Sequence, residues 1–191
     1  MNSHSNLDLY TFTNFAELNE FEINLVHEER NDLEVRVKMF DDKLISIEEH
    51  NRFLENLKKD KTKLFFLVKR GNFYIGVYTL VKIEVGNAQG GFYLFKEARV
   101  KNLVIDFLYQ TITYIFKNFP IICIYGYALK ENKAANRINK FLGLRDAIPS
   151  KSNELYYYTE IQKNIWQTEV FNNDNVIKLV SQTQKFYYYE I

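Results

Sequence analysis

The chain has 191 residues, of which 47% are hydrophobic, and its basic and acidic side chains balance to a net charge of +1. This composition is enough for a packed core and excludes a largely disordered chain, while the near-neutral charge gives no overall field that would attract nucleic acid or a membrane surface. The single cysteine, Cys123, cannot form an internal disulfide, and the sequence has no cluster of metal ligands, no secretory signal and no apolar run long enough to span a bilayer. We therefore expect a cytoplasmic domain without a metal site.

The N-terminal part predicts one strand followed by two helices. A strand is expected over residues 7–13, and a helix from about Phe15, where apolar residues approximate one helical face. A second helix opens at "SIEEHNRFLENLKKD", because Ser46 and Glu49 have the spacing of a capping box.

The middle of the chain is rich in predicted strands. "KLFFLVK" and "FYIGVYTLVKIEV" flank "RGN", which is a hairpin signal, and "GNAQG" then turns the chain into the strand "GFYLF". Apolar residues of "LVIDFLYQTITYIFKNF" recur near a period of 3.6, which predicts a helix that Pro120 ends. The unbroken apolar run "IICIYGYAL" is typical of a buried central strand.

A short amphipathic helix follows in "ENKAANRINKFLGL". Asn132 is suited to cap its start, and Gly143 can take the left-handed conformation that ends it. The strand "ELYYYTEI" comes next. Antiparallel and β-α-β segments in one chain predict an α/β fold with a sheet of mixed, mostly antiparallel direction.

Residues 164–191 are expected to form a C-terminal extension to a domain of residues 1–163. The extension is polar and rich in asparagine, with two short apolar pieces, "VIKLV" and "KFYYYEI". The sequence leaves open whether these pieces add edge strands to the sheet or pair the chain into a homodimer.

The element order and several short motifs resemble the GNAT superfamily of acyltransferases. The helix with Asn-x-x-Ala and Leu-Gly-Leu after a buried strand carries the general likeness. "EERN" at 28–31, "KMF" at 38–40, "YIGVYTLVKI" at 74–83 and "GFY" at 91–93 resemble one branch, the UDP-4-amino-sugar N-acetyltransferases of pseudaminic-acid biosynthesis. The resemblance covers about residues 10–163.

This resemblance implies acetyl transfer from acetyl-CoA to the amino group of a UDP-linked amino sugar, a small-molecule acceptor used in surface or flagellar glycan synthesis. It implies that "GFYLF" and "IICIYGYAL" are parallel neighbours that splay apart, so that the cofactor wedges between them. Backbone N–H groups at the splay would then stabilise the oxyanion that forms on the thioester. The acceptor amine needs a base or water for its proton, and the leaving thiolate needs an acid.

The resemblance also implies roles for individual residues. The catalytic positions are Tyr93, Tyr127 and Asn139. The positions expected to bind the cofactor are Leu94, Arg99, Lys101, Asn102, Leu103 and Asn132. The positions expected to line the nucleotide-sugar pocket are Arg30, Met39, Phe40, His50 and Phe53. His50 and Phe53 equally fit an ordinary helix face, and Tyr93 fits ordinary strand packing, so both interpretations stay open.

Three departures from the family pattern leave alternative functions open, and one of them is Tyr127, which stands where the branch has an acidic residue late in the central strand. Asn102 and Val104 stand where the family has small residues that let the backbone close on the diphosphate, and Val104 does not tolerate unusual backbone angles. Asn139 stands where the branch has a general-acid tyrosine, so Tyr127, Tyr125 or Tyr109 would have to supply the phenol. The alternatives are a GNAT fold that only binds, without catalysis, and an enzyme acting on peptide or antibiotic amines.

Overall fold

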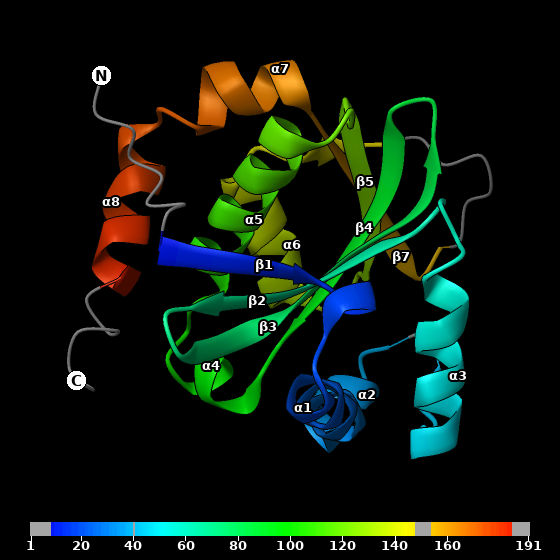
Figure 1. The fold of residues 1–191 in the computed structure, drawn as a ribbon. Coiled ribbons are helices and arrows are strands. Elements are labelled where there is room, and N and C mark those ends of the chain that lie inside the picture. Colours follow the sequence, from blue (N-terminus) through cyan, green and yellow to red (C-terminus); the bar gives the residue numbers. More distant parts are fainter. Residues whose placement is uncertain (1–8, 40, 148–153, 185–191) are drawn as a thin grey trace.

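The computed structural model of the chain describes residues 9–39, 41–147 and 154–184. These residues form a seven-stranded sheet in the order β1-β2-β3-β4-β5-β7-β6, with helices on both sides (Figure 1). The strands are β1 (Tyr10–Asn14), β2 (Leu64–Arg70), β3 (Phe73–Glu84), β4 (Asn87–Leu94), β5 (Cys123–Leu129), β6 (Arg145–Asp146) and β7 (Tyr156–Gln162). All neighbours are antiparallel except β4 and β5, which confirms the predicted mixed α/β fold.

The helices cover the two faces of the sheet. They are α1 (Glu20–Asn31), α2 (Leu33–Arg36), α3 (Ile47–Leu57), α4 (Lys96–Val100), α5 (Val104–Asn118), α6 (Lys133–Phe141), α7 (Lys163–Ile165) and α8 (Asp174–Gln184), with a 3₁₀ turn at Phe15–Glu17 and a π-helical turn at Trp166–Val170. In the described part of the chain, none of these helices combines the length and the apolar character that crossing a bilayer requires.

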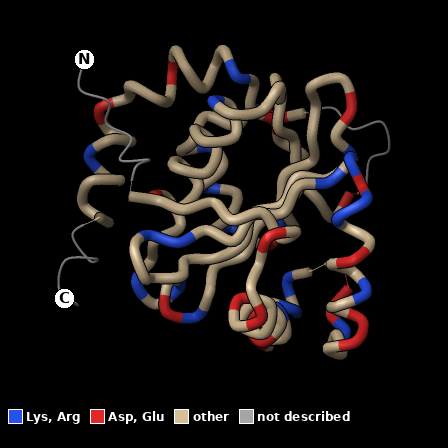
Figure 2. The backbone as a smooth tube through the Cα atoms, in the orientation of Figure 1, with Lys and Arg blue, Asp and Glu red and all other residues tan. Residues whose placement is uncertain are grey.

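Side-chain alternation along the strands builds a separate core on each face. On β2, Leu67 packs with residues of α1 and α3, whereas its neighbours Phe66 and Val68 pack with α5. On β4, Tyr93 joins the α1–α3 side, and Phe92 joins the α5 side. Acidic and basic residues are interspersed along the backbone (Figure 2), in keeping with the small net charge.

Local sequence signals explain where several elements begin and end. Ser46 and Glu49 form the predicted capping box of α3. The first helix begins later than predicted, at Glu20, because Asn19 and Glu22 form a second capping box there. Strand β4 begins at Asn87, inside the predicted turn, because Val85 and Gly86 both have positive φ and complete the hairpin turn in two residues.

In the described residues the C-terminal extension adds a helix rather than edge strands, which were one of the two alternatives left open. "VIKLV" lies in α8, whose start is held by the Asn173 side chain accepting from the backbone N–H of Asn175 and Val176, at 3.0 and 3.3 Å. "KFYYYEI" lies outside the described residues. Trp166, Val170, Val176 and Val180 belong to the same core as α5. The division of the chain at residue 163 stays a prediction.

Candidate functional site

The parallel strands β4 and β5 separate after three paired positions. They are in register at Asn87 with Cys123, Ala88 with Ile124, and Gln89 with Tyr125. Beyond this point β4 follows β3 to Leu94, and β5 follows β7 to Leu129. The expected splay of the central pair is therefore confirmed. A parallel pair that stops partway leaves the backbone groups on the facing edges without ladder partners.

A cavity of about 1080 Å³ occupies this opening, with walls formed by β4, β5, α6 and residues 34–39. Three glycines, Gly90, Gly91 and Gly126, line it. A Cβ atom on Gly126 would lie 3.2 Å from the backbone oxygen of Gly90, and one on Gly90 would lie 2.7 Å from the Tyr78 hydroxyl. Larger side chains at these two positions would therefore crowd the place where β4 and β5 begin to separate, and a ligand in the opening would meet main-chain atoms there.

All three expected catalytic residues line the cavity, with Tyr93 and Tyr127 on opposite sides of the opening and Asn139 on α6. Tyr93 lies on β4 and belongs to the α1–α3 face. Ile124 of β5 packs on the α5 face, so by alternation Tyr127 projects to the same face as Tyr93. Gln89 Nε2 donates to the Tyr127 hydroxyl at 3.2 Å, and the Tyr127 ring meets the Tyr156 ring edge-on at 5.3 Å.

Burial keeps two of the cavity phenols protonated. Desolvation raises the pKa of Tyr93 well above its ordinary value, although the charge of Arg30 opposes the shift. Desolvation also raises the pKa of Tyr125. At neutral pH these hydroxyls are hydrogen-bond donors rather than phenolates. Tyr109, another candidate phenol, is turned elsewhere: its hydroxyl donates to the backbone oxygen of Phe171 at 2.8 Å, and burial raises its pKa to about 12.

Helix α6 brings two expected residues, Asn132 and Asn139, to the cavity. Asn132 caps the helix by accepting from the Ala135 N–H at 3.1 Å, and Gly143 ends the helix with a φ of 73°, both as predicted. The Asn139 amide donates to the Thr159 hydroxyl at 3.5 Å. Asn139 has no acidic proton, so this side of the cavity offers hydrogen bonds but no general acid.

The start of α5 lies at the same cavity. Asn102 and Val104 line it, and Leu103 is fully buried as the N-cap. Asn102 adopts the left-handed conformation, with a φ of 53°, and Val104 is the first residue of the helix proper, so Val104 needs no unusual backbone angle. No side chain caps this helix start within the described residues, so its first N–H groups are available to an anion.

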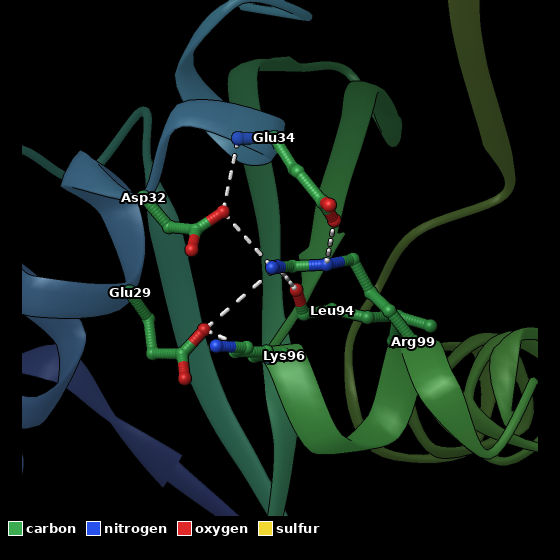
Figure 3. Close-up of polar contacts among 6 residues, drawn as sticks. All are labelled: Glu29, Asp32, Glu34, Leu94, Lys96 and Arg99. Carbon is green, nitrogen blue, oxygen red and sulfur yellow. Dashed lines mark hydrogen bonds and ion pairs between the residues drawn. The ribbon is translucent and has the colours of Figure 1, made fainter.

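The two expected cofactor cations have intramolecular contacts. Arg99 lines the cavity, but its guanidinium contacts Glu29, Asp32 and Glu34 and donates to the backbone oxygen of Leu94 (Figure 3). Lys101 Nζ lies over the ring of Phe73, 4.8 Å from its centroid, and is not among the described residues that line the cavity.

Among the described residues that were expected to line the nucleotide-sugar pocket, Met39 lies in the cavity wall, whereas Arg30, His50 and Phe53 do not. Phe40 lies outside the described residues. Arg30 donates from Nη2 to the backbone oxygen of Asp41 at 3.0 Å, while its buried Nη1 has no hydrogen-bond partner in the described part of the chain. His50 and Phe53 are not in the cavity wall: His50 packs beside His27 between α3 and α1, and Phe53 packs edge-on against Phe65 at 5.2 Å.

The burial of His50 predicts a pH dependence of stability. Desolvation, and then the charge of His27, lowers the pKa of His50 to about 4 from an ordinary value of 6.5. Between pH 6.5 and 4 the unfolded chain therefore binds a proton that the folded chain does not, so stability falls as the pH falls. We expect the free energy of unfolding to drop by about 2 kcal/mol from pH 7 to 5 through this group. Urea unfolding at both pH values measures it, and a His50→Leu variant with the same pH dependence as the wild type would contradict the assignment.

Sequence reasoning missed Gln89, Lys38 and Tyr156, which also line the cavity. The pairing of Tyr156 with Leu129 at the end of β5 follows from the register of two strands that are far apart in the sequence. Gln89 reaches the cavity wall because β4 and β5 separate immediately after it.

The chain is similar in sequence to a known acetyltransferase. No model of a known protein family matches the chain. Over 125 residues the chain is 32% identical to the acetyltransferase PseH of Campylobacter jejuni subsp. jejuni serotype O:23/36 (strain 81-176), a match that spans 65% of this chain and 78% of that protein.

Two solved structures have similar folds. The Campylobacter jejuni N-acetyltransferase PseH in complex with acetyl coenzyme A matches with a TM-score of 0.64 at 25% identity, over 81% of this chain and 99% of that chain. A spermidine N-acetyltransferase from Vibrio cholerae in complex with CoA and spermine matches with a TM-score of 0.73, over 84% of this chain and 99% of that chain. At 16% identity, the second likeness concerns the fold alone.

Proposed function

Because this chain belongs to the family of the PseH acetyltransferases, we propose that it transfers the acetyl group of acetyl-CoA to the amino group of a nucleotide-linked amino sugar in pseudaminic-acid biosynthesis. The observation that carries this proposal is the separation of β4 from β5 over a glycine-lined cavity. A protein that had lost its cofactor site would have no need to keep this gap open, so we do not favour the non-catalytic alternative.

The cavity fits an acetyl-CoA molecule in three respects. The opening beyond Gly90 and Gly126, where β4 and β5 have moved apart, suits a pantetheine arm, and the unpaired backbone beyond Gln89 suits the thioester oxygen. The uncapped start of α5, at Val104, suits the diphosphate, because helix N–H groups and the helix dipole favour an anion. Asn132, at the start of α6, would contact the arm from the other wall. The acetyl thioester supplies an activated acyl group. The chain's own residues would orient the thioester and the acceptor amine and protonate the departing thiolate.

The acceptor would enter from the face that carries α1–α3. Tyr93 and Tyr127 project to this face, and Lys38 and Met39 line the cavity on the same side. A sugar nucleotide carries a diphosphate, which Lys38 in the cavity wall would attract, whereas Arg30 lies outside the wall with its Nη1 buried and would have to reorient to reach it. Phe40 follows Met39 in the sequence and remains part of this proposal as a stacking group for the base.

The proposed chemistry is direct attack by the neutral amine on the thioester carbonyl. The new C–N bond forms, the C–S bond breaks, and the amine proton passes to water or a nearby base. We assign the protonation of the departing thiolate to the Tyr127 hydroxyl, since Asn139 cannot supply a proton. Tyr93, held neutral by burial, would donate a hydrogen bond near the acetyl group.

Replacing Tyr127 with phenylalanine tests this assignment. We expect kcat to fall about 100-fold, at the lower end of what a general acid contributes, while the KM for acetyl-CoA stays within about threefold. The measurement is release of free thiol with acetyl-CoA and a UDP-4-amino-sugar. Tyr158→Phe is the matched control, because Tyr158 lies opposite Tyr127 on β7 but is not in the cavity wall.

Two outcomes would count against the proposal. An unchanged kcat in Tyr127→Phe would remove the role of this phenol. A folded wild-type protein that binds acetyl-CoA but acetylates peptide amines, and whose melting temperature does not respond to UDP, would contradict the sugar-nucleotide acceptor.

A further inference from the structure

Arg99 connects parts of the molecule that are far apart in the sequence. It lies on α4, directly after β4, and its side chain is only 18% exposed. Its Nη1 donates to the backbone oxygen of Leu94 at 2.7 Å, and its Nη2 donates to Asp32 Oδ1 at 2.9 Å. Its Nε lies 3.3 Å from Glu34 Oε2, and Nη1 lies 3.8 Å from Glu29 Oε2 (Figure 3).

The three carboxylates come from the end of α1 and the start of α2. Asp32 ends α1 and caps α2 by accepting from the Glu34 N–H at 3.0 Å. Glu29 accepts from the Lys96 N–H at 2.9 Å and so holds the start of α4 as well. Arg99 and Lys96 therefore tie the α1–α2 junction to the segment that follows Leu94.

Both ends of this connection reach the cavity. Leu94 ends the splayed strand β4, and α2 begins the segment 34–39 that forms one cavity wall. We propose that Arg99 is a positioning residue that fixes the α2 wall of the cavity against the end of β4, rather than a ligand of the cofactor diphosphate. The kinetic part of this inference rests on the proposed function, whereas the structural part does not.

The charges at this point disfavour the diphosphate role. Three carboxylates surround one guanidinium, so an incoming diphosphate would meet net negative charge there. Charge-assisted contacts of a largely buried arginine are also costly to break, because the carboxylates are then left unpaired. Burial already raises the pKa of Glu29, and the Arg99 charge opposes that shift. Without Arg99 the carboxylates would repel one another, and the α2 wall would be free to move.

The test compares Arg99→Met with the wild type by hydrogen–deuterium exchange without ligand. The N–H groups of Val35 and Arg36 bond to the backbone oxygen of Asp32, so they report directly on the α2 wall. We expect their exchange to become at least tenfold faster in Arg99→Met. The matched control is Arg145→Met, which removes an exposed arginine contact to Glu169 and should leave these amides unchanged. Unchanged exchange in Arg99→Met would overturn the inference.

Ligand binding separates the two roles of Arg99. A positioning role predicts that the Kd of acetyl-CoA, measured by calorimetry, stays within threefold while the KM for the acceptor amine rises at least tenfold. A rise in the acetyl-CoA Kd of tenfold or more with unchanged exchange would establish the diphosphate role instead. If the wild type binds no acetyl-CoA, the proposed function fails, but the exchange experiment still decides this inference.

Asp32→Asn provides an independent variant that is expected to fold, because asparagine also caps a helix but lacks the charge. It should reproduce most of the faster exchange seen in Arg99→Met. Both changes act on the same contact between Arg99 and Asp32. Exchange in the double variant should therefore be less than twofold faster than in Arg99→Met alone. Full additivity of the two effects would contradict a shared connection.

Discussion

Replacing Gly126 with valine should weaken acetyl-CoA binding at least 100-fold, which corresponds to about 2.7 kcal/mol. A Cβ at this position would already lie 3.2 Å from the Gly90 backbone oxygen, and the two further methyl groups of valine would stand in the gap between β4 and β5. Titration calorimetry of the purified variant measures the effect. The change should leave the acceptor-side residues in place, since Gly126 pairs with Thr159 on the far side of β5.

Two control variants make the Gly126 experiment specific. Gly126→Ala adds only the Cβ and should weaken binding much less than Gly126→Val. Gly71→Asn changes a glycine at a hairpin turn, where a Cβ would contact nothing within 4 Å, and asparagine tolerates its φ of 58°. A folded Gly126→Val protein that binds acetyl-CoA as the wild type does would show that the cofactor does not use this gap.

Replacing Trp166 with alanine should destabilise the protein by about 3–5 kcal/mol, a large part of the stability of an ordinary domain. Trp166 is 1% exposed and packs on Tyr109 with ring centroids 5.7 Å apart. Its indole N–H also donates to the Thr113 hydroxyl at 3.2 Å. Removing the ring leaves a cavity against α5. The surrounding segments are anchored in the core, so they can move only partly into this cavity. Urea unfolding followed by far-UV circular dichroism measures the loss.

Trp166→Phe is the graded control, because it keeps most of the ring packing and loses the hydrogen bond. It should cost about 1–2 kcal/mol. If Trp166→Ala unfolded at the wild-type urea concentration, the C-terminal extension would not contribute to the core as the structure has it.

The main elements, and the presence of several expected residues at the cavity, could be predicted before the structure was known. The capping pair Ser46 and Glu49 and the helix stop at Gly143 are local signals, so the elements that they bound follow directly. The splay of β4 and β5 came from resemblance, since nothing in either strand alone says where pairing stops. Asn132 and Tyr93 do line the cavity, as the same resemblance led us to expect, while their cofactor-binding and catalytic roles stay predictions.

The remaining errors have identifiable physical causes. "VIKLV" is too short for its β-branched residues to distinguish a strand from a helix, although the spacing of Val176 and Val180 fits the buried face of α8. His50 and Phe53 lie on the apolar face of α3, and packing against the sheet turned that face away from the cavity. The carboxylate partners of Arg99 lie more than sixty residues earlier in the chain, as the 67-residue separation from Asp32 illustrates, so no local pattern indicated them.

The most direct test of the account is a crystal structure of the chain with acetyl-CoA. We expect the pantetheine arm between β4 and β5 in the opening beyond Gly90 and Gly126, with the two strands still paired only as far as Gln89 and Tyr125. Strands that are paired along their whole length, with acetyl-CoA bound elsewhere or not at all, would contradict it.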